Sequence, residues 1–192
     1  MWEEGLALCR ASDDRNDLRP IVAGLGFAYA LQGRLAEGRA LLEEGIGEGF
    51  GTGSLLNVAY RLAWLSEVCQ LAGHREEACQ YARQALDLAR QIKARGEEAL
   101  ALHQLGVVQA HADPPDAARA EAHYRQALVL AEALGMRPLM AHCHHGLGRL
   151  YAKIGRGAEA RGALSTAIEL YRAMDMTFWL PQAEAALEQC SG

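Results

Sequence analysis

The sequence predicts an all-α fold, a right-handed superhelical solenoid of about ten antiparallel helices, and three observations support this class. The 192-residue chain is 51% hydrophobic and rich in Ala, Leu, Arg and Glu, as helical globular chains are. A pattern of small and large apolar residues recurs with a period of about 40 residues. Glycine and proline stand between the helical segments, where helices are expected to begin and end.

Four small residues set the register of the repeat. Gly26, Ser66, Gly106 and Gly148 are separated by 40, 40 and 42 residues, and apolar residues with helical spacing surround each of them. The expected core of each first helix is Val22, Leu25 and Tyr29; Leu62, Leu65 and Cys69; Leu102, Leu105 and Gln109; and His144, Leu147 and Tyr151. The expected core of each second helix is Gly38, Leu42 and Gly45; Ala78, Ala82 and Ala85; Ala120, Tyr124 and Ala127; and Ala160, Leu164 and Ala167.

The stretch 147–174 carries the pattern most completely. Leu147-Gly148-x-x-Tyr151 is followed by Gly155 in a turn and by Ala160-x-x-x-Leu164. This pattern resembles the tetratricopeptide repeat (TPR), in which small residues let two antiparallel helices approach closely. The period exceeds the roughly 34 residues of the common TPR, so the resemblance is to a longer variety with longer helices.

We expect a single TPR domain over residues 1–192. The register divides this domain into repeats. The first twelve residues align with the second helix of the next repeat, so we expect a truncated repeat there and a chain that is a fragment of something longer. The missing helix would leave an apolar face uncovered, which predicts possible self-association through the N-terminal end. The expected parts are the second helix of a truncated repeat (1–14), repeats 19–53, 54–96, 97–136 and 137–176, and a capping helix (177–190).

Glycine and proline give expectations about helix ends. Pro20, Pro138 and Pro181 are expected in the first turn of a helix, and Gly33, Gly73 and Gly155 in left-handed turns. Glycines also alternate between residues 45 and 53. Since each costs a helix about 0.5–1 kcal/mol relative to Ala, we expect the helix there to fray or stop early, as an idle loop or as a hinge.

Composition argues against several function classes. The net charge is −5 without a block of like charges, which disfavours nucleic-acid binding. We expect no membrane partner, since no apolar run reaches about 18 residues, and no signal peptide, since the N-terminus lacks a basic region. Five scattered cysteines indicate reduced thiols in a cytoplasmic protein, with Cys69 buried and inert. Phosphate-loop, zinc-protease and serine-hydrolase motifs are missing, so we expect neither an enzyme nor a cofactor.

The C-terminal third has a more particular resemblance. The segments 136–139, 143–148 and 168–180 are similar to the C-terminal TPR region of large bacterial signalling proteins. Those proteins combine a class III nucleotide-cyclase domain, an AAA-type ATPase domain and a TPR tail. The resemblance implies a regulatory or interaction role within a longer protein. Because the catalytic parts of such proteins are not in this chain, no active-site residue carries over.

The TPR resemblance implies a binding surface, because the first helices of such arrays line a concave face. An extended peptide, or a helix with an acidic end, fits such a surface. Equally, these side chains face only solvent if no partner exists. The expected groove residues are Phe27, Tyr60, Trp64, Glu67, Gln70, His103, Gln104, Val107, His111, His142, His145, Arg149 and Lys153.

The histidines in this set raise the question of a metal. His142 and His145 share a helix face, and His103 and His145 hold the same position in successive repeats. A zinc site needs three or four converging ligands, however, and His144 is expected to point away into the core. We therefore expect a polar groove lining and no metal. Three functions remain open: a regulatory tail, a stand-alone peptide-binding receptor or adaptor, and a metal or small-ligand sensor.

Overall fold

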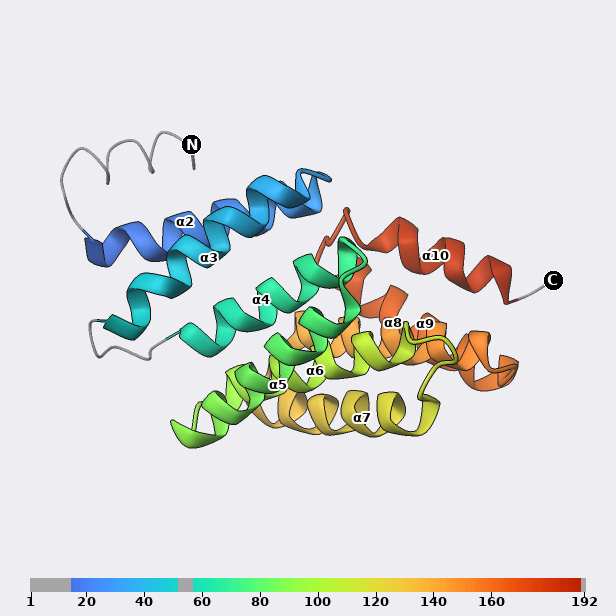
Figure 1. Ribbon diagram of the computed structural model, residues 1–192. Helices are drawn as coiled ribbons and strands as arrows, with labels where there is room; N and C mark the ends of the chain where they lie inside the picture. The colour runs from blue at the N-terminus through green and yellow to red at the C-terminus, as the bar shows by residue number, and fades with distance from the viewer. Residues whose placement is uncertain (1–14, 52–56, 191–192) are drawn as a thin grey trace. The chain divides into compact units, whose positions relative to one another are not determined.

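The computed structural model describes residues 15–51 and 57–190, and the regular secondary structure within these ranges is entirely α-helical. The chain divides into two compact units, Met1–Lys93 and Ala94–Gly192. Within each unit, successive helices run antiparallel and pack mainly as pairs: α2 with α3, α4 with α5, α6 with α7, and α8 with α9 (Figure 1). The helices are α2 Arg15–Leu31, α3 Leu35–Gly51, α4 Val58–Leu71, α5 Arg75–Gln91, α6 Arg95–Ala110, α7 Ala117–Leu134, α8 Arg137–Lys153, α9 Gly157–Ala173 and α10 Leu180–Gln189.

The predicted all-α class is confirmed by these helices. The additional helix expected within residues 1–14 lies outside the described residues. The turns within three of the pairs are also as predicted, because Gly33, Gly73 and Gly155 have φ angles of 85°, 81° and 79°. Glycine reaches this left-handed region without a Cβ clash, so it ends one helix and lets the chain turn back.

The predicted proline positions are confirmed at two of three sites. Pro138 and Pro181 stand in the first turn of α8 and α10, where a missing N–H leaves no hydrogen bond unmade. The prediction for Pro20 is wrong, because α2 begins at Arg15 and Pro20 is its sixth residue. The helix continues through Pro20, although a proline there cannot donate a backbone hydrogen bond to the preceding turn.

The prediction that the glycine-rich helix stops early is also wrong. α3 continues through Gly45, Gly47 and Gly49 to Gly51. Helix propensity is a weak preference, and packing of one face supplies most of a helix's stability in a folded protein. In α3 that face includes Leu42, which is fully buried, and Ile46, which is 9% exposed. The remaining residues of the stretch, 52 and 53, lie outside the described residues.

In unit 1, α2 and α3 approach each other backbone to backbone. A Cβ atom added to Gly26 would lie 2.8 Å from the carbonyl oxygen of Gly38, and one added to Gly38 would lie 2.5 Å from that of Gly26. The next pair uses Ser66 at the same repeat position. Its hydroxyl donates a 2.7 Å hydrogen bond to the carbonyl of Ala78 on α5. The predicted close contact of small residues is therefore present in both pairs.

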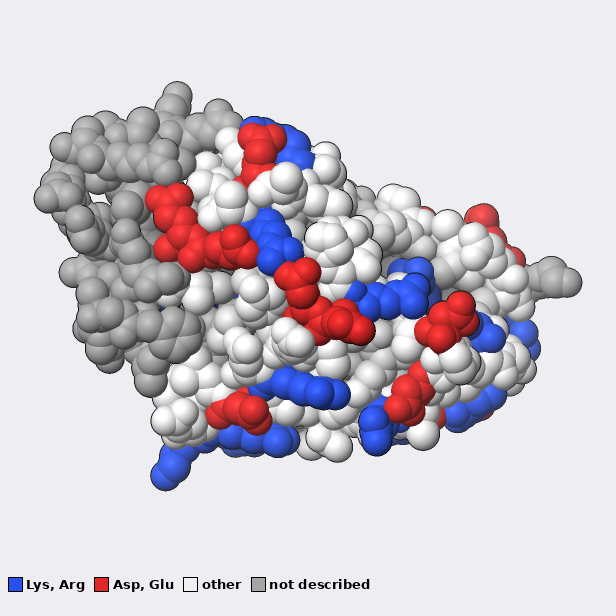
Figure 2. Space-filling model, in the orientation of Figure 1, with Lys and Arg blue, Asp and Glu red and all other residues white. Residues whose placement is uncertain are grey.

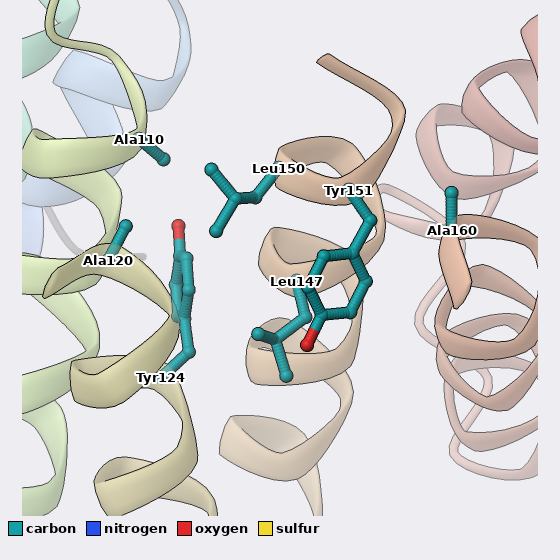
Figure 3. Packing of buried hydrophobic residues seen from close by; sticks show 7 residues of the cluster. All are labelled: Ala110, Ala120, Tyr124, Leu147, Leu150, Tyr151 and Ala160. Carbon is teal, nitrogen blue, oxygen red and sulfur yellow. The ribbon is translucent and has the colours of Figure 1, made fainter. Parts of the chain in front are cut away.

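In unit 2, large side chains fill the space above the glycines. The Tyr124 ring projects from α7 toward α8, beside Leu147 and Leu150 (Figure 3). A Cβ atom on Gly106 or Gly146 would come within 2.8 Å or 2.6 Å of this ring. Tyr124 is 1% exposed, and because its ring approaches both α6 and α8 it lies at the centre of the packing among α6, α7 and α8.

The last helix, α10, covers the N-terminal part of α8 and the C-terminal part of α9. Ala183 of α10 is buried with Ala141, Ala167, Ile168 and Tyr171, and Trp179 packs at the edge of this cluster. An ion pair of 2.9 Å joins Arg172 and Glu184 across the same contact. α10 thus adds a further layer to unit 2.

The predicted register is confirmed at all twelve second-helix core positions, each of which is buried. Cys69 is buried as expected, and burial raises the pKa of its thiol to about 11, so the reactive thiolate is disfavoured. Three first-helix expectations need correction, because Tyr29, Gln109 and His144 are only partly buried. On α8 it is instead His145, expected on the groove, that is 8% exposed. α8 packs against α6, α7 and α9 together, so its buried surface is wider than a single stripe.

Candidate partner-binding surface

The residues predicted to bind a partner lie on the first helices of the pairs, and in unit 1 three of them form an aromatic cluster. Phe27 of α2 and Trp64 of α4 stack with ring centroids 4.7 Å apart and planes 4° apart. Tyr60, also on α4, packs against Trp64, with the two ring centroids 4.3 Å apart. All three rings are partly exposed. We call these three residues the aromatic trio.

Glu67 and Gln70 continue this surface along α4. Both are partly exposed and lie one and two turns beyond Trp64. Burial, together with the nearby charge of Glu67, raises the pKa of the Tyr60 hydroxyl. The aromatic trio therefore has a carboxylate beside it.

In unit 2 the corresponding surface is built from rings of several elements. His103 of α6 and His142 of α8 have centroids 6.1 Å apart, and Trp179 meets His142 edge-on at 4.8 Å. Phe178 continues the row at 5.0 Å from Trp179 and is 55% exposed. We call His103, His142, Trp179 and Phe178 the ring wall.

Sequence reasoning missed the two aromatic members of the ring wall. Phe178 and Trp179 lie in the segment before α10, where no helical period predicts which way a side chain points. Their signal in the sequence is two adjacent aromatic residues just before a proline-started helix. The repeat register pairs His103 with His145, but the α8 ring in contact with His103 is that of His142.

A buried tyrosine supports the ring wall from behind. The Tyr171 hydroxyl lies 2.8 Å from Nδ1 of His142 and 3.5 Å from Nδ1 of His145. Since a hydroxyl has one hydrogen, Tyr171 donates to one imidazole and accepts from the other. His145 is 8% exposed and its Nε2 atom has no hydrogen-bond partner in the described structure. His145 therefore belongs to the support of the surface more than to the surface itself.

Burial keeps these imidazoles uncharged. It lowers the pKa of His103 to about 3, with a further contribution from His142, and lowers the pKa values of His142 and His145 to about 4. At neutral pH the histidines thus offer rings, donors and acceptors but no positive charge.

The cations of this surface are on α8, and they have different roles. Lys153 donates to the carbonyl oxygens of Ala110 and Ala112, at 3.2 Å and 3.3 Å, and so caps the C-terminal end of α6. Arg149 is exposed, and among the described residues no hydrogen bond or ion pair engages its guanidinium.

Three other predicted residues serve the packing of α6. His111 places Nδ1 2.8 Å from the carbonyl oxygen of Val107, close to the helix end that Lys153 caps. Val107 is partly buried against the Tyr124 cluster, and Gln104 is 6% exposed. Gln104 therefore presents little area to a partner.

Metal ligation and membrane spanning can each be examined on the described residues. In residues 15–51 and 57–190, no three His, Cys, Asp or Glu side chains lie together as a metal site requires. Among the described helices, none is long and apolar enough to span a membrane. On the face shown in Figure 2, acidic and basic side chains are interspersed.

Comparison with known proteins identifies the fold. No protein-family model matches the chain, and no curated protein matches its sequence. Solved structures do match, among them a Rap protein complexed with competence and sporulation factor, at a TM-score of 0.78, 18% identity and 88% coverage of this chain. A second is a signal transduction ATPase with numerous domains (STAND) protein with a tetratricopeptide repeat sensor from Pyrococcus horikoshii, at 0.71, 17% and 97%. A third is a putative kinesin light chain with TPR-like repeats from Podosopora anserina, at 0.60, 18% and 88%.

These similarities define a class of fold, the α-helical repeat solenoid. Within it, the chain has the tetratricopeptide-repeat fold, as its sequence pattern predicts. The chain spans 46% of the Rap protein, 29% of the STAND protein and 92% of the kinesin light chain structure.

Proposed function

We propose that this chain is a non-catalytic protein-interaction module, the regulatory TPR tail of a larger bacterial signalling protein in the cytoplasm. It binds a partner protein, a peptide or another domain of its own chain through the predicted residues of α2 and α4 in unit 1 and of α6 and α8 in unit 2. We call these residues the first-helix face of each unit. The repeats are those predicted from the sequence: 19–53, 54–96, 97–136 and 137–176, with a cap at 177–190.

The observation that carries this proposal is the gathering of partly exposed rings on the first helices of each unit and, in unit 2, on the segment before α10. The aromatic trio and the ring wall both place several rings within about 6 Å of one another at the surface. Aromatic side chains and Arg are enriched where proteins bind one another, because they supply large contact areas at low entropic cost. Clusters of exposed apolar side chains on a folded protein mark sites where it binds another molecule.

The signalling context is supported by the similarity to the STAND protein, whose repeats are described as a sensor. A chain that spans 29% of such a protein has the extent of one of its parts. The alternative is a stand-alone peptide-binding receptor or adaptor. The similarity to a Rap protein complexed with competence and sporulation factor favours it.

The proposal is tested by affinity capture with variants of the two faces. Trp64→Ala and His142→Ala change the first-helix face of unit 1 and unit 2, and Arg83→Ala and Val129→Ala are controls at exposed positions on second helices. We expect captured proteins to be lost with a first-helix variant and kept with both controls, at unchanged circular dichroism. Capture that survives both first-helix variants, or that the controls abolish, contradicts the proposal.

We also propose that the chain self-associates through its N-terminal end. The residues concerned, 1–14, lie outside the described residues. Light scattering at tens of micromolar tests this proposal. A larger mass that falls on dilution is expected, and a monomer at every concentration contradicts it.

A further inference from the structure

α8 is a cationic helix in an acidic protein. It carries Arg137, Arg149 and Lys153 and neither Asp nor Glu, whereas the whole chain has a net charge of −5. Such a local reversal of charge draws an anionic partner to this helix in preference to the rest of the surface.

Arg149 is the cation of α8 that is placed to meet a partner at the ring wall. It lies one turn beyond His145 and two turns beyond His142, so the three share one face of the helix. In agreement with its place one turn from His145, its charge contributes, after burial, to the lowered pKa of His145. Lys153 on the same helix is engaged with carbonyl groups of α6.

The ring wall provides a partly exposed surface of rings on the same face of α8 as this cation, with His142 two turns before Arg149. Phe178 is 55% exposed, and His103, His142 and Trp179 are partly exposed in an unbroken row of ring contacts. Rings of this kind bind an aromatic side chain by offset or edge-to-face contacts. Neutral imidazoles do so without competing with Arg149 for a carboxylate.

We propose that Arg149 and the ring wall together bind an extended segment of the partner that carries an aromatic side chain next to an Asp or Glu. The planar guanidinium donates two parallel hydrogen bonds to the partner's carboxylate, while the partner's aromatic ring packs against His142, Trp179 and Phe178. This inference rests on the proposed function and names the chemistry that unit 2 selects.

Unit 1 is not suited to the same segment. Its aromatic trio lies beside Glu67, which is on the same helix as Trp64 and whose charge acts on the Tyr60 hydroxyl. A partner carboxylate placed there would meet a like charge, which disfavours binding. The aromatic-acidic segment is therefore assigned to unit 2 alone.

Fluorescence anisotropy with labelled synthetic peptides tests the inference. The probes are flexible Gly-Ser peptides that contain repeated Phe-Glu pairs, with Phe-Gln and Ala-Glu versions as controls. We expect the Phe-Glu peptide to bind at least about tenfold more tightly than either control, because each of the two contacts is removed in one of them. Its affinity should also fall as salt is raised.

Variants of exposed side chains locate the binding. Arg149→Gln and Phe178→Ala are each expected to weaken binding of the Phe-Glu peptide by about tenfold. Arg137→Gln, which removes an equal charge from the exposed start of α8, and Trp64→Ala in unit 1 are expected to change it less than about twofold. Unchanged thermal unfolding of these variants excludes loss of fold.

Equal binding of the Phe-Gln peptide, or an Arg149→Gln variant with unchanged affinity, overturns the inference. So does the complete lack of peptide binding. If a captured partner nevertheless depends on the first-helix face, the proposed function stands and only the assigned chemistry fails. If capture is independent of that face as well, both fail.

Discussion

The two units apply the same repeat register to different packing. In unit 1 the close contact of α2 and α3 is between glycines, and α5 presents Ala78, Ala82 and Ala85 to α4. In unit 2 the glycines of α6 and α8 face Tyr124, and Gly148 faces Leu164, whose Cγ would lie 2.5 Å from an added Cβ atom. A small residue at a repeat position thus marks a close approach, but it does not specify whether a backbone or a ring approaches.

Where the units agree, the chemistry is that of the turn between paired helices. Arg34 lies over the Tyr29 ring at 3.6 Å and pairs with Glu37 at 2.6 Å. In unit 2, Arg156 lies over Tyr151 at 4.2 Å and pairs with Glu159. The Arg precedes the second helix and the Glu lies in its first turn, where a carboxylate is favoured by the helix dipole. This motif is independent of what fills the space between the helices.

The larger side chains of unit 2 have a consequence that unit 1 lacks. Tyrosines bring hydroxyl groups into the core, and the Tyr171 hydroxyl pairs with imidazoles of α8. Unit 2 therefore contains a buried imidazole behind its binding surface, whereas the described histidine of unit 1, His74, is exposed and the buried polar side chains of that unit are Arg61 and Ser66.

The largest effect is expected from Tyr124→Ala. Tyr124 is 1% exposed and its ring contacts Gly106 and Gly146 of two different helices, so truncation leaves a cavity. We expect a loss of about 3–5 kcal/mol in the free energy of unfolding, measured by urea denaturation. Tyr124→Phe, which keeps the ring, is the matched control and should lose less than about 1.5 kcal/mol. Equal losses in the two variants would show that the ring is not what fills the space.

The second effect is acid destabilisation confined to unit 2. Burial lowers the pKa values of His103, His142 and His145 to about 3–4, below their value of about 6.5 in an unfolded chain. As the pH falls below about 6.5, the unfolded state binds protons first, so the stabilisation present above that pH is progressively lost. At pH 5 each imidazole accounts for a loss of at most about 2 kcal/mol.

Hydrogen exchange measured by mass spectrometry resolves this effect by unit. Between pH 7 and 5, peptides from α6, α8 and α9 should lose protection, once exchange is corrected for its intrinsic pH dependence, and peptides from α4 and α5 should not. The carboxylate of Glu121 does not contribute to the change between pH 7 and 5. Hydrogen bonds from Arg156, Tyr151 and Arg125 outweigh burial and lower its pKa to about 2, so the stability it contributes is lost only below about pH 4.5. Equal loss in both units would assign the effect to something other than these histidines.

The fold was predictable from the sequence because the repeat reports packing directly. Gly26, Ser66, Gly106 and Gly148 are each small because a neighbouring helix lies against them, and their spacing therefore gives the register. Local preference was a poorer guide. The glycines of α3 and Pro20 of α2 suggested helix ends at places where the helices continue, since tertiary contacts outweigh propensity.

The candidate surface was predictable only in part. Register placed Phe27 and Trp64 on neighbouring helices, where they stack, but it did not distinguish exposed Arg149 from Gln104, which is 6% exposed. Phe178 and Trp179 belong to a connection, whose course depends on where α10 docks. Whether any of these residues binds a partner stays a prediction.

The third effect tests the backbone contact of unit 1. In Gly38→Ala the new methyl would lie 2.5 Å from the carbonyl oxygen of Gly26, which cannot move as a side chain can. We expect a net loss of about 1–2 kcal/mol, since overpacking outweighs the gain of about 0.5–1 kcal/mol in helix propensity. Gly162→Ala is the matched control: its helix position has open space, so thermal unfolding should show a small gain. A stabilised Gly38→Ala variant would mean that α2 and α3 separate freely.

The smallest effect is expected from His145→Leu, which removes a buried polar side chain from the support of the ring wall. The substitution removes a buried Nε2 atom that has no partner in the described structure and a long, 3.5 Å contact with Tyr171. Replacing such a group by an apolar one of similar size is expected to raise the free energy of unfolding by roughly 0.5–1 kcal/mol at pH 7. The gain should grow toward pH 5, because one of the imidazoles that takes up a proton on unfolding is gone. A loss of stability at both pH values would instead show that His145 contributes to the core through its contact with Tyr171.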